Sequence, residues 1–249
     1  MVRYVSIGFY PNGTSCQSDF ILLKRLSLMA TPAQLMHTLN SATGVPLPTI
    51  VDIDRKLVKG ELRTKGGRGL NAAHMTPLDA ARLLTAILAS PQANTSVEAV
   101  ERYSQTHSDK TRSSDTSFGA VRLDDLAALP ARHSFVDALE ALIASASTGS
   151  LAKLMTNSKD AWVPHIEVFA FTRATRGRIR IAGLPKGLTV SLEYVSAPGE
   201  GKQLRGKKTS RKREADETAG DLEQSRRVTE QTILAVAKLL AEESQHDRT

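Results

Sequence analysis

The segment KGELRTKGGRG, residues 59–69, combines a helix stop at Gly60, a basic turn and three further glycines within eleven residues. Glycine allows tight turns and close approach of the backbone to a ligand, and the Lys and Arg side chains favour a polyanionic partner. Such a segment can cradle phosphate as a nucleotide loop, serve as a flexible linker, or form the wing of a DNA-binding domain. The sequence on either side of it distinguishes these three possibilities.

Two helices are predicted before this segment. Thr31 is suited to cap the first helix, Pro32 follows at the first helical position, and Gly44 ends it. After the tight VPLP connection, Pro48 opens a second helix. Its predicted buried stripe is Ile50, Ile53, Leu57 and Val58. Its opposite face carries Thr49, Asp52, Arg55, Lys56 and Lys59.

A third helix is predicted after the segment, because Thr76, Pro77 and Asp79 repeat the helix-start signal. The order is therefore helix, short turn, helix, glycine-rich basic hairpin, helix. This order is typical of a winged helix-turn-helix, in which the second helix enters the major groove and the wing approaches phosphates or the minor groove. The predicted DNA-binding residues are Thr49, Arg55, Lys56 and Lys59 on the helix, and Arg63, Lys65, Gly66, Gly67 and Arg68 on the wing.

The stretch LVKGELRTKGGRG, with HMTPLDAARLL after it, resembles the winged helix-turn-helix proteins, particularly the MerR-type arrangement, over residues 29–90. The resemblance implies a DNA-binding N-terminal domain. Two features depart from that family. Asn71-Ala72-Ala73-His74 stands where aromatic residues usually surround the wing, and Pro130 interrupts the best candidate for a long dimerisation helix. An effector-sensing part is therefore not implied. In overall style the chain is also similar to small regulatory or DNA-packaging proteins of prophages.

Nucleotide binding and catalysis are not favoured. GKQLRGKK, residues 201–208, begins with Walker A spacing, but Lys208 occupies the position that needs a hydroxyl for magnesium. The six histidines are scattered without metal-ligand spacing, and KGGRG lacks the dinucleotide-binding spacing. We therefore predict no enzymatic activity, no catalytic residue, no metal site and no cofactor.

The rest of the chain is predicted as a small helix-and-sheet unit. Ser134 and Asp137 start a helix, and IEVFAF, RIRIA and LTVSLEYV form an antiparallel sheet. A last helix is predicted within DLEQSRRVTEQTILAVAKLLAEE, buried either on its own chain or between copies. The predicted organisation is 1–28 as an N-terminal arm or upstream extension, 29–90 as the winged helix-turn-helix, 91–117 as a polar linker, 118–198 as a small α+β domain, 199–219 as a basic charged connector, and 220–249 as the C-terminal helix and tail.

Composition agrees with a nucleic-acid partner. The net charge is +7 over 249 residues, which suits double-stranded DNA or another polyanion. A single cysteine, and no apolar run near the roughly 20 residues that span a bilayer, favour a cytoplasmic protein without membrane contact. We predict an α+β fold and sequence-specific DNA binding, most simply in transcription regulation and as a homo-oligomer. The alternatives are a small-terminase-like DNA-packaging subunit and a protein-interaction adaptor that does not bind DNA.

Overall fold

The structure is a computed structural model. It describes residues 30–66, 74–109, 121, 123–156, 165–172, 175–184, 187–196 and 224–244. The fold is α+β, as predicted. The helices are α2 (Pro32–Thr43), α3 (Leu47–Lys59), α4 (Pro77–Ala89), η2 (Ala93–Thr95, a short 3₁₀ turn), α5 (Ser96–Ser104), α6 (Asp124–Ala127), α7 (Phe135–Ser147), α8 (Ser150–Thr156) and α10 (Glu230–Ser244). The strands are β1 (Thr106–Ser108), β2 (His165–Phe171), β3 (Arg176–Leu184), β4 (Leu188–Ser196) and β5 (Ser225–Thr229).

Local capping fixes the starts of three helices. The side chains of Thr31, Thr76 and Ser134 each accept a hydrogen bond from the backbone N–H three residues later, and the side chain at that later position accepts one from the backbone N–H of the cap residue. Each capping box satisfies backbone N–H groups that have no partner inside the helix. At the other end of α2, Gly44 adopts the left-handed conformation, with φ of 72°. The three start positions and this stop agree with the sequence prediction.

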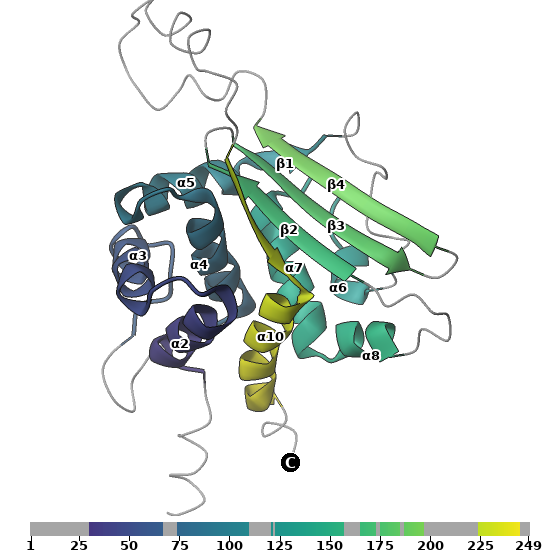
Figure 1. The fold of residues 1–249 in the computed structure, drawn as a ribbon, viewed down its shortest axis with the longest axis horizontal. Coiled ribbons are helices and arrows are strands. Elements are labelled where there is room, and N and C mark those ends of the chain that lie inside the picture. The colour runs from purple at the N-terminus through teal and green to yellow at the C-terminus, as the bar shows by residue number, and fades with distance from the viewer. Residues whose placement is uncertain are drawn as a thin grey trace, which may run out of the picture.

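The strands form one antiparallel sheet in the order β1-β4-β3-β2-β5. Figure 1 shows the helices gathered on one side of this sheet. Alternate residues of the strands explain that arrangement: Ile179 and Ile181 of β3 and Val190 of β4 are fully buried on the helix side. The residues between them lie on the opposite, outer face of the sheet.

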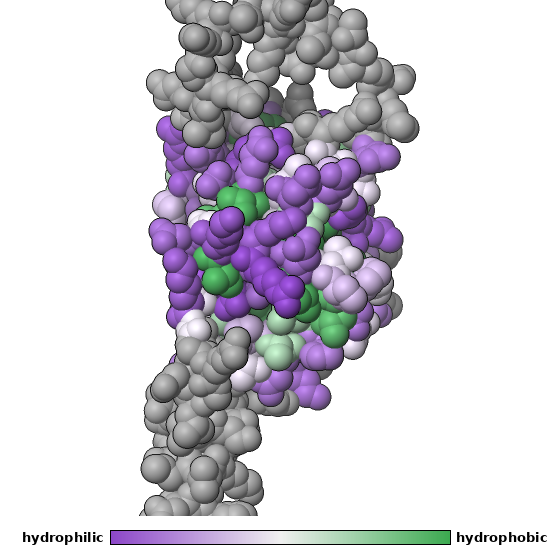
Figure 2. Space-filling view, turned by 90° about the vertical axis from the view of Figure 1, so that its left-hand side faces the viewer, coloured by the Kyte–Doolittle hydropathy of each residue, from purple (hydrophilic) through white to green (hydrophobic). Residues whose placement is uncertain are grey.

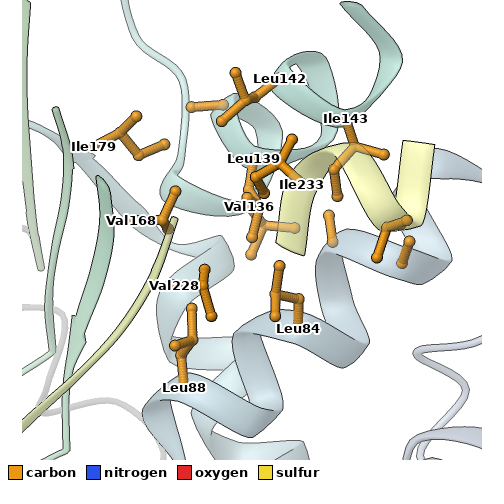
Figure 3. Close-up of a cluster of buried hydrophobic side chains, with 14 of the residues drawn as sticks. Leu84, Leu88, Val136, Leu139, Leu142, Ile143, Val168, Ile179, Val228 and Ile233 are labelled. Atoms are coloured by element: carbon orange, nitrogen blue, oxygen red, sulfur yellow. The ribbon is translucent and has the colours of Figure 1, made fainter. Parts of the chain in front are cut away.

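A single buried cluster connects the helices to the sheet. Figure 3 shows side chains from α4, α7, α10 and the sheet meeting in this core, among them Leu84, Val136, Val168 and Ile233. The last helix is buried, as predicted, and it packs within its own chain against α7 and α2. The core therefore runs through both the segment predicted as a winged helix-turn-helix and the segment predicted as a separate α+β unit.

Three segments differ from the sequence prediction. Residues 225–229 form β5, so the prediction of helix there is wrong; α10 begins only at Glu230. The segment 91–117 contains η2, α5 and β1, and Ala99, Val100 and Tyr103 of α5 are buried. Residues 60–66 and 74–76, on both sides of the glycine-rich turn, contain no strand, and residues 67–73 lie outside the described residues. Residues 1–28 and the connector 199–219 also lie outside them.

Tyr103 joins α5 to the end of the β2–β3 hairpin. Its hydroxyl receives a hydrogen bond from the Phe171 backbone N–H at 3.0 Å and lies 2.8 Å and 2.7 Å from the carbonyl oxygens of Phe171 and Arg176. The ring packs edge-on against Phe135, which in turn packs edge-on against Tyr194. Burial raises the pKa of Tyr103 to about 12, so the hydroxyl stays protonated and can donate.

Removing this hydroxyl should destabilise the fold. Tyr103→Phe leaves buried backbone groups of β2 and β3 without their partner, and we expect the free energy of unfolding to fall by about 1 to 3 kcal/mol. Urea denaturation followed by circular dichroism measures the change. Ser104→Ala, at an exposed neighbour, should change stability by less than about 0.5 kcal/mol. Equal stability of Tyr103→Phe and the parent would contradict the buried hydrogen bonds.

Candidate nucleic-acid interface

The exposed face of α3 carries the residues predicted to contact DNA. Thr49, Arg55 and Lys59 are exposed, and Lys56 is partly exposed. They occur at helical spacing opposite the stripe of Ile50, Ile53 and Leu57, which is buried in the core. Val58, predicted for this stripe, is only partly buried. Figure 2 views the molecule from the side on which α3 lies in Figure 1, and the described surface there is mainly hydrophilic.

Two acidic residues reduce the positive charge of this surface. Asp52 accepts a hydrogen bond from Lys56 at 3.1 Å, and Glu61 accepts one from Lys65 at 2.9 Å. The hydrogen bond and charge of Lys65 lower the pKa of Glu61. Arg55 and Lys59 have no carboxylate within salt-bridge distance among the residues that the structure describes. These two cations are therefore the strongest candidates on α3 for contact with an anion.

Arg63 was predicted to contact DNA, but its guanidinium pairs with Asp54 of the same chain. Its Nε lies 2.6 Å from Oδ1 of Asp54, and its second guanidinium nitrogen donates to Oδ2 at 2.8 Å. Both side chains are more than 90% buried, with exposed fractions of 9% and 8%. Burial raises the pKa of Asp54, and the Arg63 guanidinium acts in the opposite direction. This two-pronged ion pair fixes the chain just after α3 to the buried side of that helix.

Asp79 holds both ends of the glycine-rich segment. Its carboxylate accepts hydrogen bonds from Thr64 N–H at 2.9 Å and Thr64 Oγ1 at 3.0 Å. It also accepts from Thr76 N–H at 3.1 Å and Thr76 Oγ1 at 2.9 Å. Asp79 is only 2% exposed, so the carboxylate that accepts these hydrogen bonds is itself buried. We name residues 65–75 the basic loop; one buried carboxylate closes it at its two neighbours, Thr64 and Thr76.

Further contacts hold the stretch of chain that leads from α3 into the basic loop. Arg82 of α4 donates to the Leu62 carbonyl at 3.1 Å, and Leu62 N–H donates to the Leu57 carbonyl at 3.0 Å. Gly60 lies against Val97 of α5 so closely that a Cβ there would be 2.9 Å from a Val97 methyl. Lys65 and Gly66 follow this anchored stretch and are exposed. Gly67 and Arg68, also predicted to bind DNA, lie outside the described residues.

Other candidate sites are less well supported. A polar pocket is lined by Arg132, His133, Ser134 and Asp137, but the last three already have structural partners. Ser134 and Asp137 cap α7, and His133 bridges the Pro130 carbonyl and the Tyr194 hydroxyl. Among the described residues there is no cluster of three His, Cys, Asp or Glu side chains suited to a metal ion. No helix within the described ranges is long and apolar enough to cross a membrane.

Sequence reasoning found the exposed face of α3 and the helix-start role of Asp79, but it missed the buried pairing of Asp54 with Arg63 and the contact of Asp79 with Thr64. Asp54 stands among Ile50, Ile53 and Leu57 at the spacing of the buried stripe, and an acid at such a position requires a buried cation. That signal was available from the sequence. No family model, curated protein or solved structure matches this chain, so a functional proposal depends on the chain's own residues.

Proposed function

We propose that the chain binds double-stranded DNA, with the exposed face of α3 in the major groove and the basic loop on the phosphate backbone. The observation that carries this proposal is the anchored loop next to a basic helix face. Asp54 and Asp79 hold the root of the loop through Arg63, Thr64 and Thr76. A fixed root supports this proposal, because it holds Lys65 and Gly66 next to α3, as backbone recognition requires.

The roles of the side chains differ in this proposal. Arg55 and Thr49 are the donors on α3 that read base edges. Lys59, Lys65 and Arg68 neutralise phosphates and set the register on the duplex. Arg63 is a positioning residue, because its guanidinium is committed to Asp54. The most direct biological role is transcription regulation, by a homo-oligomer on a repeated or palindromic site. A DNA-packaging subunit would use the same contacts in a ring.

The test separates base recognition from phosphate contact. Duplexes selected from random sequence by the purified chain supply a specific site, and a scrambled duplex supplies the reference. Arg55→Ala should relax the preference at one base position by about 1 to 3 kcal/mol. Lys65→Ala should weaken binding to both duplexes and lower the salt slope by about 1. Fluorescence anisotropy across a salt series measures both effects.

Arg132→Ala is the matched control, because it removes one exposed arginine that is not in the proposed interface. It should bind like the parent, and circular dichroism should show every variant folded. If the parent binds neither duplex, or if Arg132→Ala weakens binding as much as Lys65→Ala, the proposed interface is wrong. Retained folding without DNA binding would favour the protein-interaction adaptor.

A further inference from the structure

The outer face of the sheet carries an arginine-flanked aromatic side chain. In the strand register, Phe169 of β2 lies directly opposite Arg227 of β5 on one side and Arg178 of β3 on the other. The two guanidinium carbons are 5.9 Å and 6.0 Å from the centre of the Phe169 ring. Phe169 is partly exposed. The three side chains form one row across β5, β2 and β3.

Phe169 differs from its aromatic neighbour Phe171 in that its ring face is accessible. Arg176 lies over the ring of Phe171 at 4.1 Å, and Phe171 is only 9% exposed. Its ring face is therefore already occupied. The arginines beside Phe169 stand at the outer limit of a cation–π contact, so they flank the ring without covering it at stacking distance. The Phe169 ring is thus accessible to a planar partner.

The charge of this face favours an anion. Four arginines, at 176, 178, 180 and 227, and two glutamates, at 167 and 193, share the outer side of the strands. Burial opposes ionisation of Glu167, but hydrogen bonds from Arg180 and Arg227 outweigh it and lower its pKa. Glu167 therefore holds both arginines in place, at 3.1 Å and 2.7 Å. The result is an excess of positive charge fixed around Phe169.

The arginines keep donors for a second partner. Arg180 and Arg227 each use one terminal nitrogen for Glu167, and a guanidinium has five N–H donors. Their side chains are 47% and 54% exposed. A phosphate can thus be bound without breaking the ion pairs with Glu167. Helices cover only the opposite face of the sheet among the residues that the structure describes (Figure 1).

We propose that the outer face of the sheet binds single-stranded nucleic acid, with one unpaired base stacked on Phe169 and flanking phosphates on Arg227 and Arg180. Stacking on a sheet aromatic beside cations suits an unpaired base, whereas the bases of a duplex are already stacked on each other. An acidic peptide would satisfy the arginines but would have no use for the ring. This site is separate from the duplex interface on α3.

The experiment measures binding of a fluorescein-labelled oligo(U) and oligo(dT), each of about 12 nucleotides, by anisotropy across a salt series. Phe169→Leu keeps an apolar side chain but removes the aromatic face, and it should weaken binding about 10-fold. Phe169→Tyr keeps the aromatic face and should bind like the parent. Arg227→Ala should lower the salt slope by about 0.7. Arg132→Ala should bind like the parent.

The outcomes decide the proposal independently of the duplex interface. No binding of either oligonucleotide by the parent overturns it, as does parental affinity in Phe169→Leu. Competition by polyglutamate, with Phe169→Leu unaffected, would show an electrostatic surface for acidic peptides instead. If Phe169→Leu melts at a lower temperature than the parent, the other two variants decide. Phe169→Tyr should then bind like the parent, and Arg227→Ala should have the lower salt slope; an unchanged salt slope in Arg227→Ala overturns the proposal. Duplex affinity is measured on the same variants, and it should not change.

Discussion

Arg63→Ala is expected to lower the free energy of unfolding by about 3 to 5 kcal/mol at neutral pH. The substitution removes both hydrogen bonds to Asp54 and leaves a carboxylate that is more than 90% buried without its cation. A buried charge without a partner is costly because the protein interior solvates it poorly. Urea denaturation measures the loss. Removing a DNA contact on an exposed side chain would give no such loss, so the experiment distinguishes a buried structural role for Arg63 from direct contact with DNA.

The loss should depend on pH. Burial already raises the pKa of Asp54, and without Arg63 nothing comparable opposes that effect, so its pKa rises further. A carboxyl group whose pKa is higher in the folded than in the unfolded protein binds its proton more tightly when folded. Its stabilising contribution is complete below the unfolded value of about 3.9 and is lost as pH rises through the folded pKa. The deficit of Arg63→Ala relative to the parent should therefore shrink on acidification.

Two controls make this result specific. Lys65→Ala, two residues further and exposed, should change stability by less than about 0.5 kcal/mol. The double variant Asp54→Leu with Arg63→Met removes both charges together and should recover much of the loss. A deficit below about 1 kcal/mol, or one that grows as pH falls, would contradict the buried pair.

The parts of the fold that the sequence predicted are those fixed by neighbouring residues. The caps at Thr31, Thr76 and Ser134 depend on side chains three positions away, and strands β3 and β4 are specified by alternation of apolar residues. β5 was missed because SRRVT contains two arginines and a single buried residue, Val228. Only pairing with β2 makes it a strand, and pairing between segments far apart in the sequence leaves no local pattern.

The candidate site residues also separate into those that local sequence predicts and those that depend on contacts between distant segments. Thr49, Arg55 and Lys59 were placed correctly on an exposed face because helical spacing alone determines which side of α3 they occupy. Arg63 looked identical to its basic neighbours in sequence, and only its approach to Asp54 separates it from them. The row formed by Arg227, Phe169 and Arg178 depends on the register of three strands, which no single segment specifies.

Asp79→Ala should cost about 3 to 4 kcal/mol of stability, because Asp79 has two structural roles. It caps α4 through Thr76, and it binds the backbone and hydroxyl of Thr64 across the basic loop. A cap alone contributes about 1 kcal/mol. The remaining loss comes from the Thr64 contacts, which are hydrogen bonds to a charged and buried acceptor. Denaturant unfolding of the purified variant measures the total.

Asp137 provides the matched comparison for Asp79. Asp137 completes the same kind of capping box with Ser134 on α7, where it accepts a hydrogen bond from Ser134 N–H at 2.8 Å. Unlike Asp79, Asp137 is exposed, and among the described residues its hydrogen bonds are confined to that cap. Asp137→Ala should therefore cost only about 1 kcal/mol, and the difference in stability loss between the two variants measures the closure of the basic loop.

Hydrogen exchange at the Thr64 amide should accelerate in Asp79→Ala beyond what global unfolding explains, while the same amide in Asp137→Ala should follow global stability. If the proposed interface is right, folded Asp79→Ala also loses affinity for duplex DNA, because Thr64, next to Lys65, is no longer held by the α4 carboxylate. Equal losses of stability in the two variants would show that the Thr64 contacts add nothing, and the basic loop would then have no rigid root from which to bind DNA.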